Sequence, residues 1–207
     1  MQIGIDFGTT HTSAAFYDGQ RIHSIPLDAQ NANPGLLRSM IYITRQQKCY
    51  LGLDAVCTFL QQDTGRPVVY QKKVVGTIEN TVAQQYKQPG EPDGPITIVY
   101  DVIIEEDTGA QGRLLQSIKT GLRTDSYKGT NIFGRYYTIQ ELIALLLTRV
   151  RTRAEAYLQT EVRQVTLGRP VQFSDDALAD QRAEQRLREA ATLAGFEQIT
   201  FVAEPVA

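Results

Sequence analysis

The chain has 207 residues, of which 42% are hydrophobic and 21% are charged, and its formal net charge is -2. This composition is typical of a globular domain with a sizeable core and excludes a disordered or fibrous chain. The small negative charge gives no general attraction to nucleic acid or to an anionic membrane, and no apolar run approaches the roughly 20 residues that span a bilayer. We therefore expect neither nucleic acid nor a membrane as a partner.

The first residues and the cysteines indicate the cellular setting. The segment 1–6 has no basic region, and Asp6 interrupts its apolar run, so it does not resemble a signal peptide. Cys49 and Cys57 are the only cysteines, and they lie eight positions apart with no histidine near them. This spacing fits no metal site. A reduced, cytoplasmic protein is the simplest interpretation.

The chain begins with a predicted β-meander. Residues 2–7 form a strand, 8–10 a turn and 12–17 a returning strand. Asp18-Gly19 is a strong two-residue hairpin signal and leads into 21–25.

A further strand is predicted over 39–44, with Met40 and Tyr42 on the face opposite Ile41 and Ile43, and a short helix over about 53–62. The following region is less regular. It contains β-rich pieces at 67–76 and 96–104 around a loop, 88–95, that holds three prolines and two glycines. We expect an inserted α+β subdomain over about 45–116, within a core formed by about 1–44 and 117–207.

The last third alternates helices and strands. Thr138 and Glu141 form a capping-box pattern, and apolar residues then recur at helical spacing through Leu158. A strand is predicted over 162–167. A second helix should start at 174–176 and end at Gly195, and a last strand should cover 199–202.

The most informative segment is the string 3–13, in which a strand, a glycine turn and a returning strand follow one another. Gly8 has no Cβ, so a phosphate can approach the backbone, and successive amides of such a turn form an anion site. The hydroxyls of Thr9 and Thr10 add donors. Asp6 is placed to hold a hydrated Mg²⁺. The competing interpretation is a hairpin turn that merely contains glycine and threonines.

This string resembles the first phosphate motif of the superfamily that includes actin, the sugar kinases and the 70-kDa heat-shock chaperones. Neither G-x-x-x-x-G-K-[ST] nor G-x-G-x-x-G occurs in the chain. The resemblance implies an α/β fold, a ribonuclease H-like lobe of an actin-like ATPase with a mixed five-stranded sheet flanked by helices. It also implies ATP or ADP with Mg as cofactors.

Three further stretches resemble the chaperone branch, in particular its DnaK and YegD-like members. The stretch 117–122 is similar to the motif whose lysine assists ATP hydrolysis, which implies that role for Lys119. The stretch 165–173 is similar to the segment with the switch proline, here Pro170. The stretch 191–207 is similar to the connector whose glutamate faces Mg²⁺ and the lytic water, which implies that Glu204 binds the metal through water and takes part in catalysis beside Asp6.

Two positions depart from the chaperone pattern. His11 stands where those proteins have asparagine. It could either contact a phosphate or be an ordinary exposed residue of the turn. The family's switch arginine has no match at its usual spacing, where Glu184 stands instead with Arg182 and Arg186 nearby.

The family's second phosphate motif, its adenosine-binding segment, its second lobe and its substrate-binding domain have no counterpart in the sequence. We therefore expect a piece of a longer ATP-dependent chaperone, with nucleotide, unfolded polypeptide and co-chaperones as partners of the whole. One wall of the site alone should bind nucleotide very weakly and should not hydrolyse it. The alternatives are the first lobe of a sugar or acetate kinase, a non-catalytic actin-like scaffold, and a stand-alone binding module.

Overall fold

The computed structural model describes residues 1–82, 96–170 and 176–203. By their internal contacts the residues form two compact units, one made of Met1–Thr64 with Gln111–Ala207 and the other of Gly65–Ala110. The smaller unit is narrower than the predicted insertion of 45–116.

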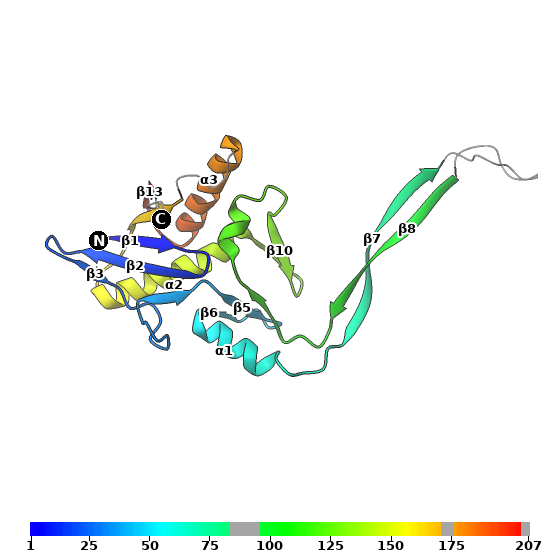
Figure 1. Cartoon of the computed structure of the whole chain (residues 1–207), viewed down its shortest axis with the longest axis horizontal. Coiled ribbons are helices and arrows are strands. Elements are labelled where there is room, and N and C mark those ends of the chain that lie inside the picture. Colours follow the sequence, from blue (N-terminus) through cyan, green and yellow to red (C-terminus); the bar gives the residue numbers. More distant parts are fainter. Residues whose placement is uncertain (83–95, 171–175, 204–207) are drawn as a thin grey trace, which may run out of the picture. The chain divides into compact units, whose positions relative to one another are not determined.

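The larger unit is built on a mixed sheet, in which the strands follow the order β13-β12-β1-β2-β3 and β4 also pairs with β2. The strands are β1 (Gln2–Phe7), β2 (His11–Tyr17), β3 (Ile22–Ser24), β4 (Leu36–Arg38), β12 (Gln164–Arg169) and β13 (Gln198–Ala203). β1, β12 and β13 run parallel, and β2 is antiparallel to β1, β3 and β4 (Figure 1).

The predicted count of five strands is wrong, because six strands of the described residues form this sheet. β3 pairs with the end of β2, at Ala15–Tyr17, and leaves the start of β2 open on that side. β4 pairs there, with His11–Ser13. The two short strands thus share one edge of β2.

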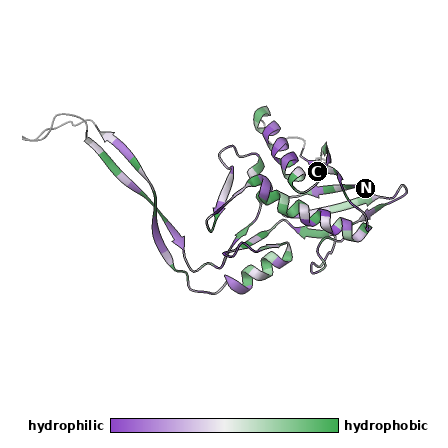
Figure 2. Ribbon diagram, turned by 180° about the vertical axis from the view of Figure 1, so that it is seen from behind, coloured by the Kyte–Doolittle hydropathy of each residue, from purple (hydrophilic) through white to green (hydrophobic). Residues whose placement is uncertain are grey.

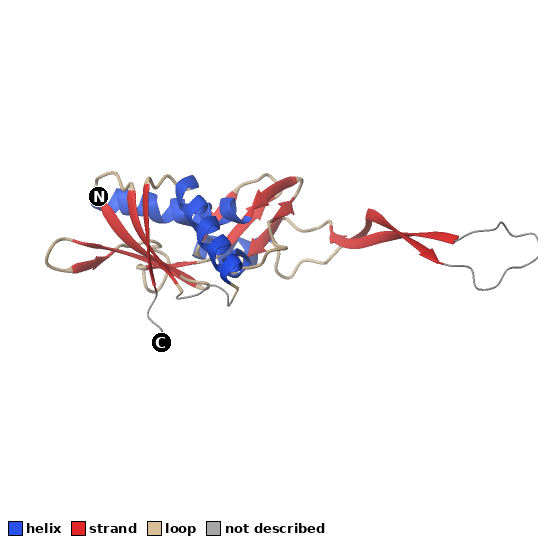
Figure 3. Ribbon diagram, turned by 90° about the horizontal axis from the view of Figure 1, so that it is seen from above, coloured by secondary structure: helices blue, strands red, loops and turns tan. Residues whose placement is uncertain are grey.

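Helices cover one face of this sheet (Figure 3). They are α2 (Ile139–Leu158) and α3 (Ala177–Leu193), which contact each other and the short 3-10 helix η1 (Ile118–Leu122). The burial of β1 alternates accordingly. Ile3, Ile5 and Phe7 lie in the core with the apolar side of α2, whereas Gln2, Gly4 and Asp6 are exposed.

Capping residues set the helix ends. The Oγ1 of Thr138 accepts from the amide of Glu141 at 3.1 Å, and the Glu141 carboxylate accepts from the amide of Thr138 at 2.8 Å. This confirms the predicted capping box. Asp176 caps α3, and the predicted start at Ser174 lies outside the described residues. Gly195 has φ +92°, which confirms the left-handed residue expected after this helix.

A second, three-stranded sheet also belongs to the larger unit. It is formed by β5 (Ile41–Thr44), β6 (Cys49–Leu51) and β9 (Gly112–Leu115), with β5 in the centre and α1 (Leu53–Gln62) in contact with all three strands. The predicted helix 53–62 is confirmed. The strand predicted over 39–44 is present as β5, and both of its faces are buried. The unit also contains a hairpin, β10 (Gly129–Ile132) and β11 (Arg135–Thr138).

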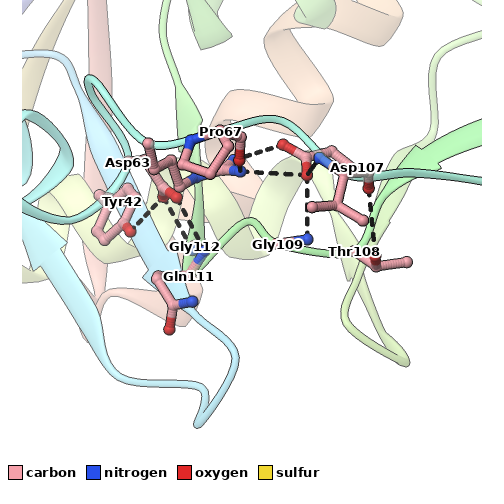
Figure 4. A network of polar contacts seen from close by, with 10 residues as sticks. Tyr42, Asp63, Pro67, Asp107, Thr108, Gly109, Gln111 and Gly112 are labelled. Atoms are coloured by element: carbon pink, nitrogen blue, oxygen red, sulfur yellow. Dashed lines mark hydrogen bonds and ion pairs between the residues drawn. The ribbon is translucent and has the colours of Figure 1, made fainter.

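Asp63 joins the two segments of the larger unit where the smaller unit interrupts the sequence (Figure 4). Its carboxylate accepts from the amides of Gln111 at 2.9 Å and Gly112 at 3.0 Å, and from the Tyr42 hydroxyl at 2.6 Å. A Cβ at Gly112 would lie 2.2 Å from the Tyr42 ring, so only glycine fits beside that tyrosine.

The smaller unit is a two-stranded antiparallel ribbon of β7 (Tyr70–Val82) and β8 (Ile96–Asp107). The register shifts by one residue between Val74 and Gly76, which leaves Val75 as a bulge. At the start of the ribbon Arg66 forms an ion pair with Asp107, whose carboxylate also accepts from the amide of Gly109 (Figure 4). The predicted loop 88–95 lies outside the described residues.

None of the helices in the described ranges is both long enough and apolar enough to cross a bilayer.

Candidate functional site

Asp6 lies near the carboxyl end of β1, on the face of the sheet that the helices leave uncovered. Its side chain is exposed, and in the antiparallel register it stands opposite Ser13 of β2. The carboxyl ends of the parallel strands β1, β12 and β13 meet at one edge of the sheet, where open α/β sheets place their ligands. Asp6 is therefore an accessible carboxylate at the edge where a ligand is expected.

The turn from Gly8 to Thr10 connects β1 to β2 at this edge. A Cβ on Gly8 would lie 2.3 Å from the carbonyl oxygen of His11, so the turn itself requires glycine. Ser39 holds the turn through two hydrogen bonds. Its hydroxyl donates to the carbonyl of Gly8 at 2.9 Å, and its amide donates to the carbonyl of Thr10 at 2.9 Å. The turn is held in one conformation while its outer side stays exposed.

Thr9 and Thr10 are both exposed, as donors to an anion must be. His11 is half-buried and stands opposite Arg38 of β4, and residues directly opposite in an antiparallel pair share a face. His11 and Arg38 therefore lie on the same uncovered face as Ser13 and Asp6. The Nε of Arg38 is buried and has no hydrogen-bond partner among the described residues.

Arg38 and Ser39 are site residues that sequence reasoning missed. In the sequence Arg38 precedes the predicted strand 39–44 and Ser39 begins it, and no local pattern shows that this segment returns to the first turn. A buried serine that bonds both sides of a glycine turn is recognisable only after β4 has been paired with β2.

Lys119 is placed by a different element, the one-turn helix η1. Ile118 and Leu122 anchor this helix in the core, and Lys119 between them is half-buried. The buried Arg186 of α3 donates from Nη1 to the carbonyl oxygens of Leu122 at 3.0 Å and Thr124 at 2.9 Å. These bonds satisfy backbone carbonyls at the end of η1 that have no partner within the helix. They also attach the segment that carries Lys119 to α3.

Pro170 follows the last residue of β12, at the same edge of the sheet as Asp6. The preceding Arg169 forms ion pairs with Asp180, at 2.9 Å, and with Glu184 of α3. Glu184 also contacts Arg188 at 3.4 Å. The position where the chaperone pattern has an arginine is thus occupied here by a carboxylate between two arginines.

The structure brings Asp6, Gly8, Thr9, Thr10 and His11 together on one hairpin, whereas Pro170 and Lys119 come from other elements. Glu204 lies outside the described residues.

No three metal-binding side chains cluster within the ranges that the structure describes. One exposed carboxylate beside hydroxyls and backbone amides is a donor set that suits Mg²⁺, which retains several of its waters and binds with the phosphates of a nucleotide. Asp6 and its turn thus fit the cofactor that the motif implies.

Comparison with known proteins agrees with this architecture. Residues 106–207 match the family described as Hsp70 protein. Over all 207 residues the chain is 24% identical to heat shock 70 kDa protein 8 of Arabidopsis thaliana, of which it spans 31%. Over 95 residues, 46% of the chain, it is 35% identical to the chaperone protein DnaK of Thermotoga petrophila and of Thermotoga maritima, of which that stretch covers 15%.

The mixed α/β sheet and the family match together define the class as that of the actin-like ATPase folds. Within this class the chain is similar to the 70-kDa heat-shock protein family, whose model matches residues 106–207. It spans less than a third of the length of these relatives.

Proposed function

We propose that the chain supplies one wall of a Mg-nucleotide site in an ATP-dependent chaperone of the 70-kDa heat-shock type. The observation that supports this most is the turn from Gly8 to Thr10, which Ser39 holds from one side while its outer side stays exposed beside Asp6. The amides and hydroxyls of the turn would bind phosphate oxygens, and the Asp6 carboxylate would hold the waters of Mg²⁺.

The remaining predicted residues take roles around this turn. Lys119 would bring a positive charge to the terminal phosphate and orient water, and Glu204 would act on the same water and the metal. Pro170, beside the Arg169 ion pairs, would transmit the state of the nucleotide. Arg38 would add a second positive charge near the phosphates, because it stands opposite His11, the residue that follows the turn.

Bound Mg²⁺ would neutralise charge on the β- and γ-phosphates during hydrolysis. This chain's own residues bind and orient the phosphates from one side only. Because catalysis in this class depends on positioning between preorganised groups, the chain alone should bind nucleotide very weakly and should show no appreciable hydrolysis. ATP hydrolysis belongs to the longer protein.

The word chaperone in the names of the DnaK relatives supports unfolded polypeptide as the client of the whole protein, with co-chaperones as further partners. Cys49 and Cys57 are both free, which supports a reducing, cytoplasmic setting. The inserted subdomain over about 45–116, which contains the ribbon of β7 and β8, is also part of the proposal.

The test is a titration of the chain with Mg-tripolyphosphate and Mg-ADP, followed by backbone amide NMR. We expect the amides of Gly8, Thr9 and Thr10 to shift, with millimolar affinity. Asp6→Asn should remove the dependence on Mg²⁺, whereas Asp18→Asn, in the next hairpin turn, should leave it unchanged. Arg38→Met should weaken tripolyphosphate binding more than Arg21→Met does.

Unshifted turn amides, or micromolar affinity of the chain alone, would contradict the proposal. In the longer protein, ATP hydrolysis stimulated by an unfolded polypeptide would support the chaperone assignment. Transfer of the γ-phosphate to a sugar or to acetate would instead support the kinase alternative.

A further inference from the structure

The ribbon of β7 and β8 has open edges among the described residues, because its sheet contains these two strands alone. A two-stranded ribbon is marginally stable in water unless another strand or a packed layer joins it. Several of its hydrophobic side chains are exposed, with Ile78 at 59%, Tyr100 at 53% and Ile104 at 45%. Hydrophobic residues recur along both strands of the ribbon (Figure 2). The ribbon thus has both the apolar residues and the unpaired edges of a sheet that another strand completes.

The two edges differ in charge. β8 carries four acids, Asp101, Glu105, Glu106 and Asp107, and no basic residue, so that two copies of β8 would offer one another no counter-charge. β7 carries Lys72, Lys73 and Glu79. Only the outer edge of β7 therefore contains charges of both signs.

The bulge at Val75 decides on which face these charges lie. Lys72 stands opposite Glu105 and Glu79 opposite Val99, and both of these β8 positions are on one face because β8 alternates without interruption between them. Lys72 and Glu79 are seven positions apart and would point to opposite faces of a regular strand. The extra residue in β7 places both on the same face.

We propose that two copies of this chain associate through the outer edges of β7, antiparallel about a two-fold axis between Val75 and Gly76. In this register Lys72 faces Glu79 of the other copy, and by symmetry Glu79 faces its Lys72. The same register places residues of compatible chemistry opposite one another along the edge: Tyr70 with Thr81, Gln71 with Asn80, Lys73 with Ile78, and Val74 with Thr77.

Each of these pairs also has the correct parity, since both members lie on the same face of their own ribbons. The result is a four-stranded sheet in the order β8-β7-β7-β8. Lysine on an edge strand ordinarily discourages pairing with other strands. Here Lys72 meets a carboxylate, so it selects this register and disfavours others.

The test is sedimentation of the chain over a concentration series. We expect the wild type to form a reversible dimer. In the Lys72→Glu variant the new glutamate faces Glu79 of the other copy, and the two-fold axis repeats this pair. In the Glu79→Lys variant the new lysine faces Lys72 of the other copy in the same two places. Because like charges in direct opposition cost at least the 1.4 kcal/mol that corresponds to tenfold in affinity, each variant alone should have a dissociation constant raised at least tenfold.

A mixture of the two variants should dimerise again, because the Lys72→Glu chain presents acids at both positions and the Glu79→Lys chain presents lysines at both. The variant that carries both substitutions should form homodimers within a fewfold of the wild-type affinity. Asp101→Lys makes the same charge change as Glu79→Lys on β8, opposite Thr77 and away from the outer edge of β7, and should have little effect.

A wild-type chain that stays monomeric at millimolar concentration overturns the proposal. So does a dimer that is insensitive to both single reversals, because its interface would then lie elsewhere. The mixing experiment also separates misfolding from repulsion, since two misfolded variants would not restore a dimer of defined mass.

Discussion

The guanidinium of Arg186 lies 3.0 Å from the carbonyl oxygen of Leu122, so that helix α3 holds the end of the short helix that carries Lys119. The same helix binds Arg169 through Glu184, two positions earlier. One rigid element therefore contacts both the segment of the predicted hydrolytic lysine and the segment that precedes the predicted switch proline.

Replacing Arg186 by methionine should destabilise the larger unit by about 2–3 kcal/mol, because buried carbonyls lose a charged donor. The amide of Thr124, which donates to the carbonyl of Gly121, should exchange faster with solvent. Urea unfolding and hydrogen exchange measure the two effects. Arg182→Met, at an ion pair with the exposed Asp125, is the matched control and should cost less than about 1 kcal/mol.

Replacing Glu184 by arginine would give α3 the residue type that the chaperone pattern has at this spacing. We expect a loss of stability of about 1–2 kcal/mol, because the new cation would lie between Arg169 and Arg188. Thermal unfolding at low and high salt measures it, and the loss should shrink as salt screens the repulsion. Gln185→Arg, at the exposed neighbouring position, should be nearly neutral; an equal loss there would contradict the explanation.

Gly8→Ala should destabilise the first hairpin by about 1–3 kcal/mol, because the new Cβ meets the His11 carbonyl at 2.3 Å. Gly4→Ala is the control on the same strand. The nearest atom to a Cβ there is the Ala15 carbonyl oxygen at 3.9 Å, so the change should stay within about 0.5 kcal/mol. Denaturant unfolding of both variants tests the difference, and equal stabilities would show that the turn relaxes around alanine.

The smaller unit should lose stability in acid. Hydrogen bonding from Arg66 lowers the pKa of Asp107 from its ordinary 3.8 to about 2, with further help from the amides of Gly109 and Val69. Because the folded pKa is depressed, this stabilisation is complete above pH 3.8 and is lost as the pH falls toward 2.

The protection factor of the Gly109 amide, which is its intrinsic exchange rate divided by the observed rate, measures this loss between pH 5 and pH 2. Asp107→Asn should leave this protection factor low and nearly independent of pH. An Asp107 carboxyl that titrates near 3.8 in the folded chain would show that the ion pair with Arg66 does not form in solution.

Local patterns in the sequence predicted much of the structure correctly. The alternation over 2–7, the Asp18-Gly19 turn, the capping box at Thr138 and the left-handed Gly195 all depend on residues within a few positions of each other. The phosphate-type turn is equally local. Such features are fixed by backbone geometry and short-range hydrogen bonds, so a single sequence reveals them.

Tertiary structure alone decided which distant segments meet. Ser39 reaches the Gly8 turn across 31 positions, and Arg38 comes to stand opposite His11, because β4 takes the part of β2 that β3 leaves free. Both faces of β5 are buried because other elements surround it, and no alternation within its four residues could show that. The bulge at Val75 likewise appears only once β7 is paired with β8. The packing of the whole core determines which strands pair with each other, and no periodic pattern in the sequence encodes that pairing.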